Sequence, residues 1–154
     1  MCLFLTLNTS KTEFLLIGLK QQQLAKINSC SLDTVNSTRS LGFIFDEHLT
    51  FSDQIPGLSK SCYSQIRQLR CIRPYLDLKT ASTIVTSIVH SKLDYCNSLY
   101  YNLPEYQLNR LQLIQNSLAR AVVRAPKSSH IPSLRSLHWL KIKERLDYKI
   151  LSLT

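Results

Sequence analysis

Glycine is scarce in this sequence, and the three glycines that occur lie far apart. Isolated glycines cannot build the glycine-rich loop whose backbone N–H groups cradle a phosphate, so that class of nucleotide site is excluded. Long hydrophobic runs are also missing, because charged residues interrupt every apolar stretch before the roughly 18 residues that a membrane span needs. The sequence therefore predicts no membrane-spanning segment.

The sequence also lacks a secretory signal and the cysteine patterns of disulfide-rich or zinc-binding proteins. Residues 1–7 have no basic region before them and no small-residue cleavage site after them, so we expect no secretory signal and an intracellular protein, in the nucleus or the cytoplasm. The five cysteines are odd in number and form no C-x-x-C pair. This pattern argues against a disulfide framework and against a structural zinc site.

Residues for catalysis or metal binding do not cluster along the chain. The four histidines are dispersed, and no Ser, Cys or His lies in a recognisable nucleophile motif. Asp46 and Glu47 are the only adjacent acidic pair, and they follow a strand-like run. We expect Asp46 to favour a turn there rather than to hold a metal ion, and we expect no cofactor from these residues.

Acidic residues are outnumbered by basic ones, 10 against 19, which gives a net charge of +9. Residues 1–77 hold eight Lys or Arg and six acids, whereas residues 78–154 hold eleven Lys or Arg and four acids. A strongly basic balance favours polyanionic partners. The second half of the chain is therefore the part expected to face a polyanion.

Hydrophobic periodicity divides the chain near Leu49 and predicts an α+β fold. Residues 14–18 and 41–45 are short apolar runs typical of buried strands, and residues 24–27 are a third possible strand. We therefore expect a small sheet in residues 1–48, followed by a mainly helical region in residues 49–154.

Four helices are expected after this boundary, each from apolar residues at steps of three and four. The first begins close to residue 55, with Ser52 as a possible cap and Pro56 in its first turn. The chain stops inside the fourth pattern, so we expect a piece of a longer protein. The four apolar stripes are Ile55, Leu58, Cys62, Ile66 and Leu69; Leu78, Ala81, Ile84, Val85, Ile88 and Val89; Leu108, Leu111, Ile114, Leu118 and Val122; and Ile142, Leu146, Ile150 and Leu151.

Basic residues gather on the first and third of these helices. Three arginines of the first helix recur at steps of three, on a face turned from its apolar stripe. Such a face is either a nucleic-acid contact or simply a solvated helix surface, and the sequence leaves both open. The candidate nucleic-acid-binding residues are Lys60, Arg67, Arg70, Arg73, Arg110, Arg120, Arg124 and Lys127.

Several segments, read in order, resemble the reverse transcriptase of non-LTR retrotransposons, the LINE elements of the chicken-repeat-1-like group. Residues 8–18 (NTSKTEFLLIG) are similar to the family's fourth palm motif and the strand after it, and residues 41–46 (LGFIFD) to the next strand. Three downstream strings are similar to hallmarks of the helical region after the palm: SKLDYCNSL with the following Leu103-Pro104, LQLIQN, and LHWL. Lys141 departs from the proline that usually follows the last string.

This resemblance implies a palm-edge sheet followed by the thumb and connection region of an RNA-directed DNA polymerase encoded by a transposable element. The parent enzyme holds Mg²⁺ with aspartates of motifs that this chain does not contain, so the resemblance implies primer–template gripping helices without activity in the chain alone. Lys11 matches a lysine that assists pyrophosphate departure, and it is the single weak catalytic candidate. The implied partners are an RNA template, RNA–DNA or DNA duplex, and an upstream palm and fingers segment.

Two other functions remain open on the sequence. The chain could be a non-enzymatic, basic, helical module that binds nucleic acid. It could also be a helical protein-interaction piece whose basic faces are merely solvated.

Overall fold

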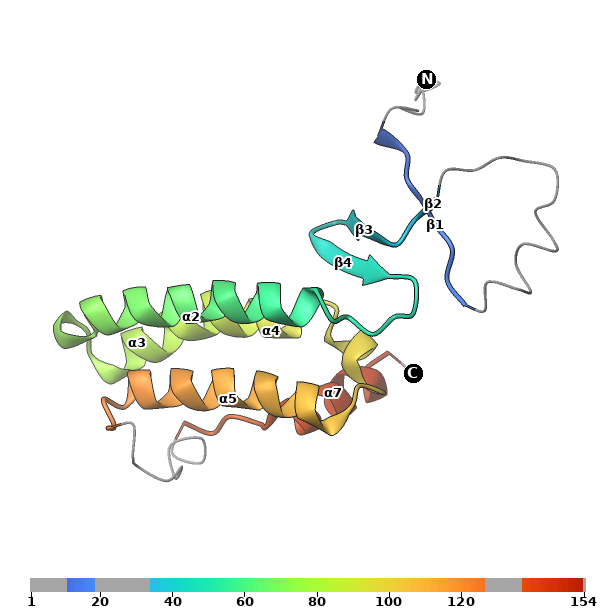
Figure 1. Cartoon of the computed structure of the whole chain (residues 1–154). Coiled ribbons are helices and arrows are strands. Elements are labelled where there is room, and N and C mark those ends of the chain that lie inside the picture. Colours follow the sequence, from blue (N-terminus) through green and yellow to red (C-terminus); the bar gives the residue numbers. More distant parts are fainter. Residues whose placement is uncertain (1–10, 19–33, 127–136, 154) are drawn as a thin grey trace, which may run out of the picture. The chain divides into compact units, whose positions relative to one another are not determined.

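The computed structural model describes residues 11–18, 34–126 and 137–153, and it shows an α+β fold, as expected (Figure 1). Two pairs of short strands are followed by a mostly helical part. The chain divides into two compact units, Met1–Gln54 and Ile55–Thr154, so the division falls a little after the predicted boundary at Leu49. The possible strand at residues 24–27 lies outside the described residues.

The first unit contains both strand pairs. Strand β1 (Phe14–Leu15) pairs in parallel with β2 (Thr34–Val35), and β3 (Ser37–Ser40) pairs antiparallel with β4 (Phe43–Asp46). Leu41 and Gly42 connect β3 to β4 with φ angles of 49° and 83°, as in the two-residue hairpin turns whose central residues both have positive φ.

The two predicted strands are shorter than expected. Residues 41 and 42 form the hairpin turn rather than strand, and Leu41 is 90% exposed. The prediction of a buried strand over residues 14–18 was wrong, because only Phe14–Leu15 is strand and Phe14 and Ile17 are about half exposed. A parallel pair of two residues forms few ladder hydrogen bonds and covers little side-chain surface.

Asp46 organises the turn after β4, as predicted. Its Oδ2 accepts hydrogen bonds from the backbone N–H and the hydroxyl of Thr50, at 2.8 and 2.9 Å, and its Oδ1 accepts one from the N–H of Phe51 at 2.7 Å. Partial desolvation acts to raise the pKa of Asp46, but these hydrogen bonds outweigh it and hold the pKa below its ordinary value. The turn places the ring of Phe51 edge-on against buried Phe43.

The second unit consists of helices with short connecting turns. Its first helix begins at Gln54 with Pro56 in its first turn, as expected, and Ser52 lies two residues before it. A continuous helical run then passes from Leu78 to Asp94 through a π turn (Figure 1). The elements are α2 (Gln54–Ile72), η2 (Arg73–Tyr75), α3 (Leu78–Val85), the π turn η3 (Thr86–His90), α4 (Ser91–Asp94), η4 (Asn97–Tyr100), α5 (Glu105–Val122) and α7 (Ile142–Leu151).

The core of this unit follows the predicted stripes of α2 and α5. All five predicted apolar residues of α5 are buried, and so are four of the five in α2, with Leu58 half-buried. In the second stripe Leu78, the first residue of α3, is exposed, and so is Ile88. The π turn shifts the register around Ile88 and carries Val89 and His90 inward. Of the α7 stripe, Ile142 and Leu146 are buried and Leu151 is exposed.

No helix of the described part is long and apolar enough to cross a bilayer.

Polar contacts fasten α7 and the residues before it to the other helices. Gln115 donates from Nε2 to the carbonyl of Leu140 at 2.7 Å, and Gln112 accepts at Oε1 from the N–H of Ile142 at 3.0 Å. Arg145 forms a two-pronged ion pair with Asp94. The three downstream strings of the resemblance supply Asp94, both glutamines and Leu140, so these strings contribute to packing.

Buried His90 completes this contact region. Its ring lies edge-on to Trp139, with 4.4 Å between ring centroids, and it is 2% exposed. Burial, together with the positive charge of Arg145, lowers the pKa of His90 to about 4, although Asp94 opposes the change. The folded unit therefore holds this histidine neutral.

Two leucines of α5 provide a matched test of the core. Leu118→Ala should reduce the free energy of unfolding by about 2–5 kcal/mol, because Leu118 is fully buried. Leu113→Ala, at a position 54% exposed on the same helix, should change it by less than about 0.5 kcal/mol. Urea denaturation followed by circular dichroism measures both, and equal costs would contradict the assigned packing of α5.

Acid should destabilise the helical unit through His90. The side chain binds a proton near pH 6.5 in the unfolded chain and near pH 4 in the folded one. The contribution of His90 to the free energy of unfolding is therefore complete above pH 6.5 and is lost as the pH falls toward 4. The loss should be on the order of 3 kcal/mol. His90→Phe should flatten the measured stability between pH 6.5 and 5. A slope unaltered by His90→Phe would refute this assignment.

Candidate nucleic-acid interface

The C-terminal ends of α2 and α5 meet, and a hollow of about 220 Å³ lies between them. Arg70 belongs to the last turn of α2 and Arg120 to the last turn of α5. The two basic clusters expected from the sequence, which are about fifty residues apart, are thus brought together. The hollow is lined by Arg70, Arg73, Pro74, Arg120, Ala121, Arg124 and Ala125.

Local backbone geometry sets the position of these arginines. Helix α5 ends with the N–H of Ala125 donating to the carbonyl of Arg120 at 3.0 Å, while Arg124 adopts a φ of 56°. This is the helix end that glycine normally forms, and a left-handed conformation costs an arginine roughly 1–2 kcal/mol. Helix α2 gives way at Arg73 to the turn η2, where Pro74 supplies no backbone N–H.

Arg73 and Arg124 hold the two helix ends together by an exchange of hydrogen bonds. Arg73 donates from Nε to the carbonyl of Val122 and from Nη1 to that of Leu76, both at 2.6 Å. Arg124 donates from Nη2 to the carbonyl of Arg73 at 2.7 Å. The last carbonyls of a helix have no partner within the helix, and the Arg73 guanidinium supplies a donor to one of them, that of Val122. The carbonyl of Arg73 accepts from Arg124 in addition to the N–H of Leu76.

The expectation that Arg73 lies on a face of the first helix turned from its apolar stripe was wrong. The side chain is 8% exposed and bonded to carbonyls of two other segments. A step of three residues keeps a side chain on one face only while the helix continues, and α2 ends at Ile72. Arg73 therefore stabilises the helix ends and contributes a positive charge to the lining of the hollow.

The positive charge of the hollow is not neutralised by acids. No Asp or Glu lines it, and the ion pairs found among the described residues join other side chains: Glu47 with His48, Glu105 with Lys143, and Asp94 with Arg145. Arg70 is exposed, and Arg120 makes one long contact of 3.4 Å with the Ser117 hydroxyl. Arg70 and Arg120 are therefore the guanidinium groups most available to an anion.

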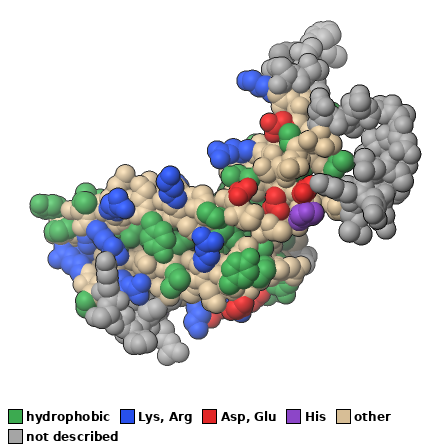
Figure 2. All heavy atoms as spheres, viewed as in Figure 1, with side chains coloured by type: hydrophobic (Ala, Val, Ile, Leu, Met, Phe, Trp, Pro, Cys, Tyr) green, Lys and Arg blue, Asp and Glu red, His purple; other side chains and the backbone are tan. Residues whose placement is uncertain are grey.

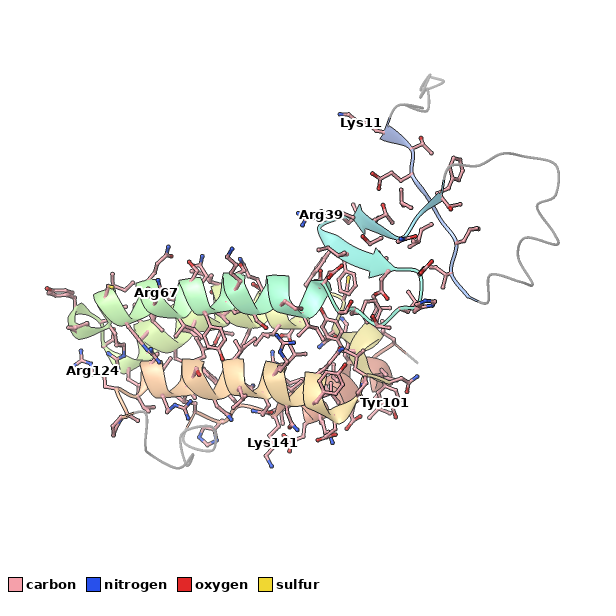
Figure 3. All side chains as sticks on the ribbon, in the orientation of Figure 1. Lys11, Arg39, Arg67, Tyr101, Arg124 and Lys141 are labelled. Atoms are coloured by element: carbon pink, nitrogen blue, oxygen red, sulfur yellow. The ribbon has the colours of Figure 1, made fainter. Side chains whose placement is uncertain are left out.

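Figure 2 shows basic side chains over the end of the helical unit where α2 and α5 finish, with no acidic side chain at that end of the face in view. Figure 3 places Arg124 at this end, and Arg67 farther back along α2. Lys60, Arg67 and Arg110 are exposed on the same two helices but do not line the hollow.

Two predicted site residues remain, Lys127 and Lys11. Lys127 lies outside the described residues. Lys11 is exposed and belongs to the first unit, whereas the hollow belongs to the second. The described residues therefore add no support to the weak catalytic assignment of Lys11.

Sequence reasoning missed the small residues that make the hollow. Pro74, Ala121 and Ala125 leave space between the arginines, and no periodic pattern marks them. One usable signal was the position of Arg70 and Arg120, each in the last turn of its helix, where positive charge complements the helix dipole.

The described residues do not fit the Mg²⁺ that the resemblance attributes to the parent enzyme. Both oxygens of Asp46 already accept hydrogen bonds from the turn, and the described residues contain no group of three His, Cys, Asp or Glu side chains able to hold a metal. Two-metal chemistry needs several converging carboxylates. We therefore derive no step through a metal ion.

Comparisons with family models, with curated proteins and with solved structures found no match to this chain. The geometry and charge of the hollow, together with the resemblance in the sequence, are therefore the indications of function.

Arg73→Gln should lower the free energy of unfolding by about 2–3 kcal/mol, because it removes hydrogen bonds from a charged donor to buried carbonyls. Arg67→Gln is the matched control, since this arginine is exposed on the same helix, and it should change the stability by less than about 0.5 kcal/mol. Chemical denaturation of both variants measures the difference. Indistinguishable midpoints would show that Arg73 does not hold the helix ends.

Proposed function

We propose that the helical unit grips the phosphate backbone of nucleic acid, as part of the thumb and connection region of a LINE-type reverse transcriptase. One observation carries the proposal: four arginines from two distant segments line a single hollow that has no acidic residue. An excess of Lys and Arg over acids in residues 78–154 supports it, because the field of the whole region then attracts a polyanion.

The chemistry of the hollow favours contact with phosphates over contact with bases. A guanidinium group presents a planar fork of N–H donors that matches two phosphate oxygens. Among the described residues no aromatic side chain lines the hollow, so these residues offer a base no ring to stack on. Since phosphates carry no sequence information, binding should depend on the shape and charge of the duplex.

The proposed role of this chain is to hold nucleic acid and does not include nucleotidyl transfer. The family's catalytic aspartates have no counterpart here, as the sequence contains no Ala-Asp-Asp string. Arg70 and Arg120 would contact phosphates, whereas Arg73 and Arg124 keep the two helix ends in place. These two roles of the arginines also suit a non-enzymatic nucleic-acid-binding module. This module is the second candidate, because the resemblance favours the reverse transcriptase.

Salt dependence of binding tests the proposal on the full chain. Each phosphate contact releases condensed counterions, so the log–log slope of affinity against salt should be about −0.9 per contact on duplex. Exchanging both Arg70 and Arg120 for Gln should make the slope shallower by about 2 units. Fluorescence anisotropy with a labelled RNA–DNA hybrid between about 50 and 300 mM salt, the range over which such contacts weaken strongly, measures it.

The control removes the same amount of charge elsewhere. Arg39 and Lys149 are exposed and lie outside the hollow, so Arg39→Gln combined with Lys149→Gln should leave the slope nearly unchanged. In the helices, Gln retains the helix propensity of the Arg or Lys that it replaces. An identical slope in both double variants, or no binding by the unaltered chain, would reject the hollow as the nucleic-acid contact.

A further inference from the structure

The hollow is small for a ligand pocket. Its volume of about 220 Å³ is below the roughly 300–1,000 Å³ that is usual for drug-sized ligands. A nucleoside with its base therefore fits poorly, whereas a compact anion with several oxygens fits well. The small side chains of Pro74, Ala121 and Ala125 form its apolar wall.

The donors around this space come from separate elements. Arg70 comes from the last turn of α2, Arg120 from the last turn of α5, and Arg124 from the residues just after α5. Arg73 adds a buried charge whose bonded partners are neutral carbonyls. A buried guanidinium without a carboxylate is costly, and an anion seated beside it would compensate that charge.

We propose that the hollow binds the terminal phosphate of a nucleic-acid strand in preference to an internal phosphodiester. The inference rests on the proposed function and names the group that this site recognises. A terminal phosphate carries a charge of about −1.5 to −2 at neutral pH and offers three acceptor oxygens. It can therefore satisfy guanidinium forks that approach from several elements.

An internal phosphodiester matches the hollow less well. It carries a single negative charge and has a sugar on each side, so it needs room on both sides of the phosphate. The flanking residues Lys60, Arg67 and Arg110, which are exposed outside the hollow, suit such internal phosphates. The two kinds of contact would then act together, one at the strand end and the others along the backbone.

The test compares three RNA–DNA hybrids of one sequence, each with an internal label, on the full chain. Their strand ends carry a 5′-hydroxyl, a 5′-phosphate or a 3′-phosphate. One phosphorylated hybrid should bind at least about five-fold more tightly than the hydroxyl form, since charge-assisted hydrogen bonds stabilise it. The tighter of the two identifies which strand end the hollow receives.

Variants place the effect in the hollow. Arg70→Gln with Arg120→Gln should abolish the preference for the phosphorylated end, and Arg39→Gln with Lys149→Gln should retain it. Equal affinity of the unaltered chain for all three hybrids, with the expected salt slope, would overturn the terminal-phosphate site and leave the proposed function standing. Absence of binding to every hybrid would overturn both. The comparison on the unaltered chain decides the question even if a variant fails to fold.

Discussion

The candidate site of the helical unit depends on two hydrogen bonds between helix ends, one from Arg73 to the carbonyl of Val122 and one from Arg124 to the carbonyl of Arg73. Each guanidinium group satisfies a backbone carbonyl of the other helix end, so the ends of α2 and α5 are bound to one another. This contact brings Arg70 and Arg120, from the last turns of the two helices, to one place. The exchange stabilises the fold and concentrates positive charge, and the same two arginines account for both consequences.

A second set of contacts holds α7 in the unit. The side chains of Gln112 and Gln115 bond the backbone of Ile142 and Leu140, while Asp94 pairs with Arg145. The bond from Gln115 to Leu140 joins two of the segments that carry the resemblance, whereas Gln112 and Asp94 bind residues just after the last of them. Such strings can be characteristic of a family for reasons of packing alone, and their presence does not by itself indicate chemistry.

Local patterns in the sequence predicted local features of the fold. The apolar stripe of α5, the first-turn position of Pro56 and the turn at Asp46 all follow from short-range rules. The polar strand β3 (Ser37–Ser40) has no hydrophobic signal, and periodicity cannot show that α2 ends before Arg73. The hollow joins residues about fifty positions apart, and a single sequence contains no information on that pairing. The basic clusters were therefore predictable, and their convergence was not.

The central claim is that nucleic acid contacts the chain at the joined ends of α2 and α5. Titration of the isotopically labelled chain with an RNA–DNA hybrid, followed through the arginine Nε–H signals in NMR spectra, tests it most directly. The signals of Arg70 and Arg120 should shift progressively with added hybrid, while that of Arg73, bonded to Val122, should shift little. The largest shifts at Arg39 or Arg145, with Arg70 and Arg120 unchanged, would contradict the account.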